Sequence, residues 1–175
     1  VCSTDSQEIG ALARRYGAET PFERPLELAT DRVPLITVTQ HAMQAMDLLG
    51  YRADVVVQLA PTSPFIKQEN IDLAVKEVAE GRAECAVSLK RIEHEHPYRA
   101  RVMDERGYFT NFITDVDVEA IHSRQDLPTL YCTSGGLYAR RRELLDRYDG
   151  RDFALGSKRR GVVLDDIESV NIDRP

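Results

Sequence analysis

The sequence has no tryptophan and is poor in aromatic and sulfur-containing residues: aromatics make up 7% of its 175 residues, and there are three cysteines. Cys2, Cys85 and Cys132 are odd in number and widely spaced, and none belongs to a C-x-x-C pair. This pattern argues against both a disulfide framework and a zinc site. We therefore expect a reducing, cytoplasmic environment.

Long apolar runs and basic clusters are missing as well. No apolar run approaches the roughly 20 residues that a membrane helix needs, and no secretory leader opens the sequence. Acidic residues outnumber basic ones by 29 to 23, and no Lys/Arg cluster is interleaved with aromatics, which argues against a nucleic-acid partner. Because a hydrophobic content of 42% suffices for a core, we expect one soluble domain.

The most informative stretch is an apolar run, Val55 to Leu59, that ends in the turn Pro61-Thr62-Ser63-Pro64. The run does not alternate strictly, which predicts a strand buried on both faces of a parallel sheet. Two prolines end the strand and hold the Thr62 and Ser63 hydroxyls in place. Ligands of open α/β sheets bind beyond the carboxyl ends of the strands, so this turn is a candidate site. An ordinary strand-to-helix connection is the structural alternative.

Helical and strand patterns alternate around this stretch. Residues 1–4 resemble the tail of a strand, and Asp5 can cap a helix that ends at Gly17. Further helical patterns cover 34–49 and 71–78, and a strand is expected over 85–91. This order predicts an α/β fold with a mostly parallel sheet and with the turns at 3–5 and 61–64 on the same sheet edge.

Residues 94–128 break the α/β pattern. The segment is polar and bounded by prolines, and residues 99–112 predict a hairpin that turns near Gly107. His94 and His96 with their glutamate neighbours could bind a metal, but no further ligand is evident, and a structural role is favoured. Beyond the insertion, strands are expected at 137–139, 161–164 and 170–173.

Seven motifs occur in an order that resembles the cytidylyltransferases that activate sialic acid and related nonulosonic acids as CMP-sugars. Each is weak alone, but the series is specific and spans nearly the whole chain. The motifs are Ser3-Thr4-Asp5, Tyr16-Gly17-Ala18-Glu19, Arg24-Pro25-x-Glu27-Leu28-Ala29-x-Asp31, Pro61-Thr62-Ser63-Pro64, Glu95-His96-Pro97, Arg124-Gln125-Asp126-Leu127-Pro128 and Ser169-Val170-Asn171-Ile172-Asp173.

The resemblance implies a three-layer α/β/α nucleotidyltransferase domain over 1–175, Rossmann-like and of the nucleotide-diphospho-sugar transferase type. It implies that residues 94–128 form a dimerisation arm that reaches into the active site of a partner in a homodimer. In the family, a first strand and a loop with Gly, Lys and Arg cradle the triphosphate. Since no such segment precedes Val1 here, we expect an N-terminally truncated form with poor catalytic activity.

The implied reaction is attack of the sugar's anomeric hydroxyl on the α-phosphorus of CTP, which releases pyrophosphate. A triphosphate beside a sugar carboxylate calls for Mg²⁺, an ion that takes oxygen ligands. Asp173 matches the second acid of the family's D-x-D metal motif, and Asn171 stands where the first acid is expected. The resemblance thus assigns catalysis to Asp173 and Arg124, and the metal to Asp173 and Asn171.

The resemblance also implies a substrate-binding set. Arg24 matches a nucleotide-holding position, Arg124 and Gln125 match a pair that meets the acidic sugar, and Tyr138 and Phe153 match an apolar wall for its N-acyl group. Thr62 and Ser63 belong to the proline turn. An arginine suits a planar carboxylate because it can pair through two parallel hydrogen bonds.

Several positions depart from the family's pattern. Ala60 and Ile66 replace polar residues beside the proline turn, and Cys132 and Ser134 replace Arg and Asn before the strand at 137–139. These changes preserve the expected fold but leave the identity of the sugar open among neuraminic, legionaminic, pseudaminic and deaminated acids. Two alternatives follow: another sugar nucleotidyltransferase, or a non-catalytic dimeric relative.

Overall fold

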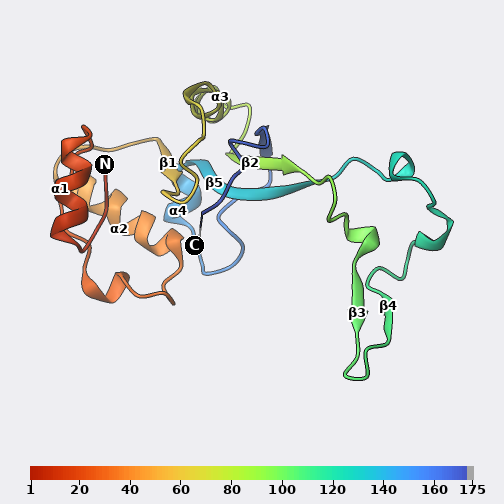
Figure 1. Ribbon diagram of the computed structural model, residues 1–175. Helices are drawn as coiled ribbons and strands as arrows, with labels where there is room; N and C mark the ends of the chain where they lie inside the picture. Colours follow the sequence, from red (N-terminus) through yellow and green to blue (C-terminus); the bar gives the residue numbers. More distant parts are fainter. Residues whose placement is uncertain (173–175) are drawn as a thin grey trace.

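The computed structural model describes residues 1–172, in which a four-stranded sheet carries a long projecting arm (Figure 1). The strand order is β1-β5-β2-β6, formed by Val55–Leu59, Tyr131–Arg141, Cys85–Arg91 and Arg159–Val163. β5 is antiparallel to both β1 and β2, whereas β2 and β6 are parallel. Three strands therefore run in one direction around a reversed β5, which confirms the α/β class with a mixed sheet.

Helices cover both faces of the sheet. α3, Gln68–Ala79, packs Ala74 and Val78 against one face together with Val55 and Val57. On the other face, α2 (Leu35–Leu48) and α4 (Arg142–Asp146) form a second core that includes Val56. Successive residues of β1 thus contact opposite cores. Among the described strands, however, β1 is an edge strand that pairs antiparallel with β5, so its residues are only partly buried and the predicted full burial in a parallel sheet is wrong.

The N-terminal residues differ from the prediction. Residues 1–4 are not a strand: the Cys2 N–H donates to the Glu19 carbonyl (2.7 Å) and the Arg24 N–H donates to the Thr4 carbonyl (3.0 Å). The segment pairs with the loop at 19–24 beside α1 and not with the sheet, so the turn at 3–5 does not follow a sheet strand. The cap of α1, Gln7–Arg15, is Ser6 and not Asp5, because the Ser6 hydroxyl accepts from the Ile9 N–H at 3.2 Å.

The expected insertion is an arm with little core of its own. Its hairpin pairs β3, Arg101–Met103, with β4, Phe109–Asn111, and short 3-10 helices lie at Pro97–Arg99, Val118–Ala120 and Arg124–Asp126. Gly107 supplies the positive φ (86°) of the hairpin turn. A further 3-10 helix, Leu26–Leu28, lies outside the arm. None of the helices within 1–172 has the length and hydrophobicity to span a bilayer.

Glu84, just before β2, links the start of β2 to the start of β6 by hydrogen bonds. Its carboxylate accepts from the Ser157 N–H (2.7 Å), the Ser157 hydroxyl (2.9 Å) and the Lys158 N–H (3.0 Å). These bonds, those from Lys158 and Ser157 first, lower the pKa of Glu84 from 4.5 to about 2. Folding therefore stabilises the ionised form of Glu84 relative to the protonated form.

We expect Glu84→Gln to lower the melting temperature at neutral pH. Because the folded-state pKa of Glu84 is depressed, its contribution to stability is complete above about pH 4.5 and is lost as the pH falls toward about 2. The gap in melting temperature between wild type and variant should close over that range, as followed by circular dichroism. Glu105→Gln, at the exposed hairpin tip, is the control; a Glu84→Gln gap that does not vary with pH would contradict the assignment.

Candidate active site

The turn Pro61–Pro64 is held between β5 and the C-terminal segment. The Ala60 N–H donates to the Gly136 carbonyl (2.9 Å), and the Ser63 N–H donates to the Ala60 carbonyl (3.1 Å). The Ile172 N–H donates to the Thr62 carbonyl at 2.9 Å. The residues expected to form a strand at 170–172 are therefore not a strand; they dock on the turn, because its carbonyl offers the acceptor that a sheet neighbour would otherwise supply.

Gly136 makes the close approach of this turn possible. A methyl group on Gly136 would lie 2.7 Å from both Cβ and Oγ of Ser63 and 2.7 Å from Ile66 Cδ1. Ser63 is 8% exposed, so its hydroxyl points into this contact and not into solvent. In the sequence, the Gly135-Gly136 pair indicated the start of a strand. The sequence did not indicate that Gly136 allows the turn to pack closely against β5.

An acidic residue that the sequence did not single out joins the C-terminal segment to α3. Glu168, 3% exposed, accepts from the Lys67 N–H (2.9 Å) and from Asn70 Nδ2 (2.7 Å). It serves as the N-terminal cap that α3 lacks in its own sequence. Burial opposes ionisation of Glu168, but these hydrogen bonds and the Lys67 ammonium hold its pKa below the usual range.

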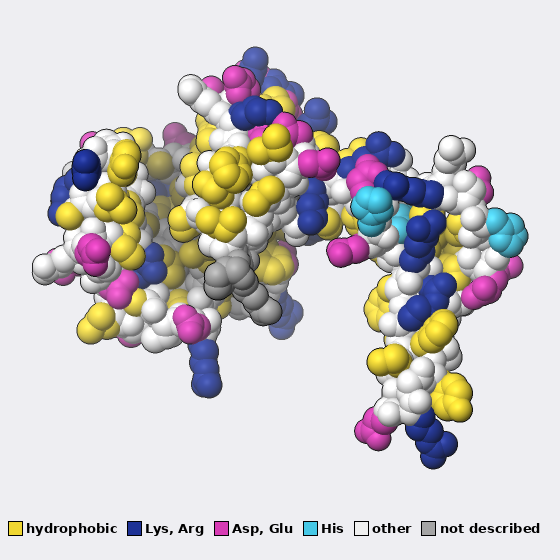
Figure 2. Space-filling model, in the orientation of Figure 1, with side chains coloured by type: hydrophobic (Ala, Val, Ile, Leu, Met, Phe, Trp, Pro, Cys, Tyr) yellow, Lys and Arg dark blue, Asp and Glu magenta, His cyan; other side chains and the backbone are white. Residues whose placement is uncertain are grey.

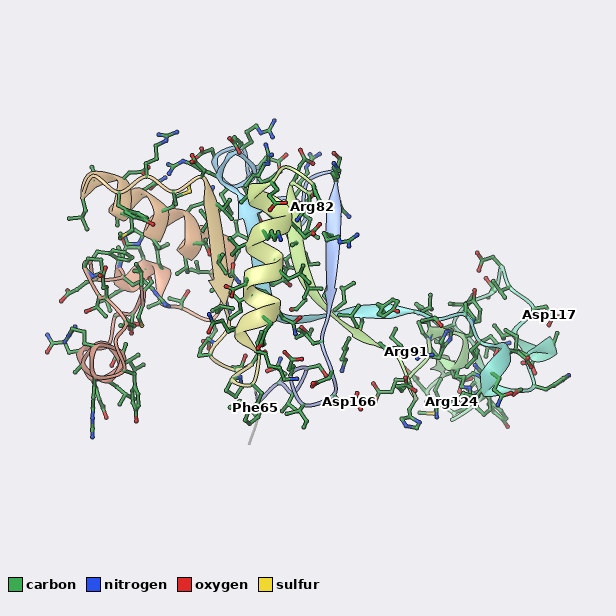
Figure 3. All side chains as sticks on the ribbon, turned by 90° about the horizontal axis from the view of Figure 1, so that it is seen from above. Phe65, Arg82, Arg91, Asp117, Arg124 and Asp166 are labelled. Atoms are coloured by element: carbon green, nitrogen blue, oxygen red, sulfur yellow. The ribbon has the colours of Figure 1, made fainter. Side chains whose placement is uncertain are left out.

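Asp165 completes this clamp on Lys67. Its carboxylate lies 2.6 Å from Lys67 Nζ and also accepts from the N–H groups of Ile167 and Glu168. The hydrogen bond from Lys67 lowers the pKa of Asp165 to about 2, so the carboxylate is ionised at neutral pH. The segment that follows β6 is thereby fixed against the residues that follow the proline turn (Figure 3).

The predicted metal residues fall at the end of this segment. Asn171 directly precedes Ile172, which bonds to the turn, whereas Asp173 lies outside the described residues. Within 1–172, no group of three or more His, Cys, Asp or Glu side chains could hold a metal ion. The oxygen donors of Asn171 and Asp173 suit Mg²⁺, an ion that completes its shell with water and substrate oxygens.

Arg24 is bound within the N-terminal part of the chain. Its Nε donates to Ser3 Oγ at 3.3 Å, and its Nη2 donates to the Ser3 carbonyl. Arg24, which was predicted to bind the nucleotide, thus links two of the motifs, Ser3-Thr4-Asp5 and the one that begins at Arg24. Its described hydrogen bonds do not reach the proline turn.

Arg124 and Gln125 lie in the arm. Arg124 forms an ion pair with Glu93, and its side chain is 48% exposed. Figure 3 shows Arg124 far along the arm from Phe65 and Asp166, which mark the turn and the C-terminal segment. Within one protomer, the arm residues and the turn are therefore not brought together.

His96 closes the base of the arm. Its Nδ1 accepts from the Tyr98 N–H (3.2 Å), and its Nε2 lies 3.1 Å from the Pro128 carbonyl. Because Nδ1 is the acceptor, Nε2 carries the proton and donates to Pro128. Both ring nitrogens are used and the side chain is 3% exposed, so His96 is a structural residue and is not available to bind a metal with His94.

Tyr138 and Phe153 are joined by a residue that the sequence did not indicate, Arg140. Tyr138 lies on β5 opposite Gln58 and Val87, and Phe153 is 63% exposed in the loop after α4. The guanidinium of Arg140 lies 4.4 Å from the Tyr138 ring centroid, and its Nε donates to the Phe153 carbonyl at 3.1 Å. Arg140 directly follows the strand expected at 137–139, and nothing in the sequence signalled this role.

The fold and the site define a nucleotidyltransferase-type α/β protein. The structure is similar to that of CMP:2-keto-3-deoxy-manno-octonic acid synthetase complexed with CTP, with a TM-score of 0.60 and 15% identity over 93% of this chain and 70% of that one. This likeness supports the fold assignment. No family profile matches the chain.

Similarity to curated proteins identifies the family. The chain is 30% identical to CMP-N,N'-diacetyllegionaminic acid synthase of Legionella pneumophila, over 100% of this chain and 72% of that protein. It is 28% identical to pseudaminic acid cytidylyltransferase of Campylobacter jejuni, over 79% of this chain and 58% of that protein. It is 37% identical to N-acylneuraminate cytidylyltransferase of Escherichia coli over 52% of this chain and 21% of that protein. The chain belongs to the nonulosonate cytidylyltransferase family, as its motifs predicted.

We expect Gly136→Ala to destabilise the protein by about 1–3 kcal/mol, because the added methyl overpacks the contact with Ser63 and Ile66. Binding of CTP should weaken in parallel, since the turn must shift to make room. Denaturant unfolding and nucleotide titration measure the two effects. Gly50→Ala is the control, because Gly50 has a positive φ (83°) and an added methyl group would find nothing within 4 Å, so the variant adds backbone strain without crowding. Equal losses of CTP affinity in both variants would contradict the proposed packing of the turn against Gly136.

Proposed function

We propose that the protein transfers the cytidylyl group of CTP to a nonulosonic acid and releases pyrophosphate. The observation that carries the proposal is the hydrogen bond between Ile172 and the Thr62 carbonyl (2.9 Å), which joins two motifs from opposite ends of the chain. It holds Ile172, which lies between the two predicted metal ligands in the sequence, at the carboxyl end of β1, the sheet edge where ligands of α/β folds bind. The relatives' names support CTP and a nonulosonic acid as substrates.

The proposed chemistry requires positioning and charge neutralisation. Mg²⁺, when bound, would neutralise the triphosphate and polarise the α-phosphorus. Asn171 and Asp173 would hold it, with the clamp of Glu168, Asp165 and Lys67 fixing the segment from which they extend. The sugar's hydroxyl then forms the new P–O bond as pyrophosphate leaves, and the proton of that hydroxyl passes to solvent or to a basic group.

A direct test is turnover with each nucleotide in turn. CTP with Mg²⁺ and N-acetylneuraminic, legionaminic or pseudaminic acid should release pyrophosphate, whereas UTP, GTP and ATP should not. A preference for another nucleotide would identify a different sugar nucleotidyltransferase. CTP binding without turnover of any acid would favour a non-catalytic relative, a possibility that Asn171 at the first acid's position raises.

We also propose that the protein is a homodimer whose arms complete each other's sites. The arm exposes a run of apolar side chains on a two-stranded hairpin, which cannot form a core alone. The run consists of Val102, Met103, Tyr108, Phe109 and Phe112, exposed by 52%, 70%, 73%, 65% and 64% respectively. Figure 2 shows apolar side chains on the arm beside basic ones, away from the body of the protein.

A second copy of the chain is the partner that fits the arm. Arg124 lies along the arm, far from Phe65 at the end of the proline turn (Figure 3), so Arg124 and its neighbour in the sequence, Gln125, would serve the other subunit's site. Arg124 would then exchange its pairing with Glu93 for the carboxylate of the acidic sugar. The CMP-sugar product would serve as a donor for lipopolysaccharide or capsule synthesis in the cytoplasm, where the three cysteines stay free thiols.

We expect Asp173→Asn to reduce kcat by about a hundredfold or more while the protein remains folded, because an amide has nearly the size of a carboxylate but offers the metal no negative charge. Steady-state kinetics over a range of Mg²⁺ concentrations, with unfolding curves alongside, provide the measurement. Asp166→Asn, an exposed acid in the same segment, should leave kcat unchanged. Normal turnover by a folded Asp173→Asn protein would remove the metal assignment.

Mixing two inactive variants tests the shared site. Asp173→Asn subunits and Arg124→Ala subunits, after verified exchange, should recover up to about a quarter of wild-type activity, because half of the dimers are hybrids with one intact site. Arg124→Ala alone should raise KM for the sugar more than for CTP. Arg106→Ala, at the hairpin tip, is the control arm variant. A monomer by light scattering, or a mixture no more active than its parents, would refute the shared site.

A further inference from the structure

Arg140 is a buried arginine for which the proposed reaction has no direct use. It lies near the carboxyl end of β5, opposite Val56 on one side and Cys85 on the other, and is 1% exposed. Burial lowers the pKa of its guanidinium, yet an arginine keeps its charge in a protein. Among the described residues no carboxylate forms an ion pair with it. A charge in this position needs other partners to hold it.

The partners that Arg140 has are parts of the expected sugar wall. Its Cζ stands 4.4 Å from the Tyr138 ring centroid, a cation–π distance, and its Nε donates to the Phe153 carbonyl at 3.1 Å. Its Nη1 lies 3.4 Å from Gln58 Oε1, which also accepts from the Thr39 hydroxyl of α2 (3.1 Å). One guanidinium thus connects the two wall residues to β1 and α2.

The backbone that presents Phe153 is strained on both sides. Asp152 and Ala154 have φ values of 49° and 50°, in the left-handed region that residues other than glycine seldom occupy. Ala154 is buried among the residues of the second core, and its N–H bonds to Asp152 Oδ1 at 2.6 Å. Such strain persists only where surrounding contacts determine the conformation, and the bond from Arg140 is one of them.

We propose that Arg140 is a positioning residue that holds Tyr138 and Phe153 as one wall, and that it thereby sets selectivity for the N-acyl substituent of the sugar. The effect on sugar selectivity rests on the proposed function. The claim that Arg140 holds Tyr138 and Phe153 together rests only on the contacts of Arg140. The planar guanidinium can stack on Tyr138 while it donates sideways to the Phe153 carbonyl. A lysine ammonium would retain the charge without this combined geometry.

The structural part can be tested without any substrate. The chain contains no tryptophan, so Phe153→Trp introduces a lone tryptophan in the loop, which can be excited selectively over the seven tyrosines. Acrylamide quenching of its emission then reports how tightly the loop is held. In this background Arg140→Met and Arg140→Lys should both raise the quenching constant. Arg142→Met is the matched control: Arg142 is a neighbouring buried arginine (6% exposed) that pairs with Asp47 and Asp146 and is not bonded to the wall. Equal quenching in the Arg140 variants and their parent would overturn the inference.

Selectivity supplies the second readout, measured in the intact protein with N-acetylneuraminic acid and its deaminated analogue. Arg140→Met should reduce the ratio of the two kcat/KM values about tenfold, the size expected from losing a cation–π contact and a charged hydrogen bond. KM for CTP should stay constant. Phe153→Ala should cause a similar loss, and combining it with Arg140→Met should add little, because the two act through one wall.

The outcomes separate the two proposals. If wild type turns over none of the nonulosonic acids with CTP, the proposed function fails, while the quenching result still decides whether Arg140 holds the loop. If turnover is normal and Arg140→Lys matches wild type in both quenching and selectivity, charge alone suffices and the positioning role is refuted. Additive losses from Arg140→Met and Phe153→Ala would refute it as well.

Discussion

The backbone hydrogen bond between Ile172 and the Thr62 carbonyl is the interaction on which the site depends. Pro61 and Pro64 lack N–H groups, so the turn cannot extend β1 and must find support elsewhere. It finds this support in the C-terminal segment on one side and in the Gly136 carbonyl on the other. The candidate site is therefore formed by segments that are remote in sequence and that meet at one sheet edge.

The protein divides into a body, which contains the sheet, and the arm. The body has two cores, one on each face of the sheet. Ile66, just after the turn, packs against one core, and Ala154, next to Phe153, belongs to the other. The arm leaves the sheet between β2 and β5 and is anchored by His96 through Pro128. Its apolar side chains have no place in either core, so the arm's stability and its use both call for a second surface.

Much of the fold could be predicted because its signals are local. The apolar run at 55–59 and the helical patterns at 34–49 and 71–78 correctly predicted β1, α2 and α3, and the motif series predicted the family. Local patterns failed where a distant partner decided the outcome. Residues 1–4 have strand-like composition but pair with the loop at 19–24, and residues 170–172 dock on the turn. Glu168 could not be found in this way, because Lys67 lies 101 residues away in the sequence. Arg140 could not be found either, because its role depends on how the loop at Phe153 folds back onto β5.

The cap that Glu168 provides for α3 has a consequence for folding. The two ends of this contact, Glu168 and Lys67, are separated by 101 residues. Closing so long a loop is slow compared with forming a local turn. During synthesis on a ribosome, α3 and the proline turn would emerge long before Glu168, which caps α3. The candidate site should therefore be the last part of the body to become ordered. A chain that stopped before Glu168 could form most of its sheet and still lack an organised site.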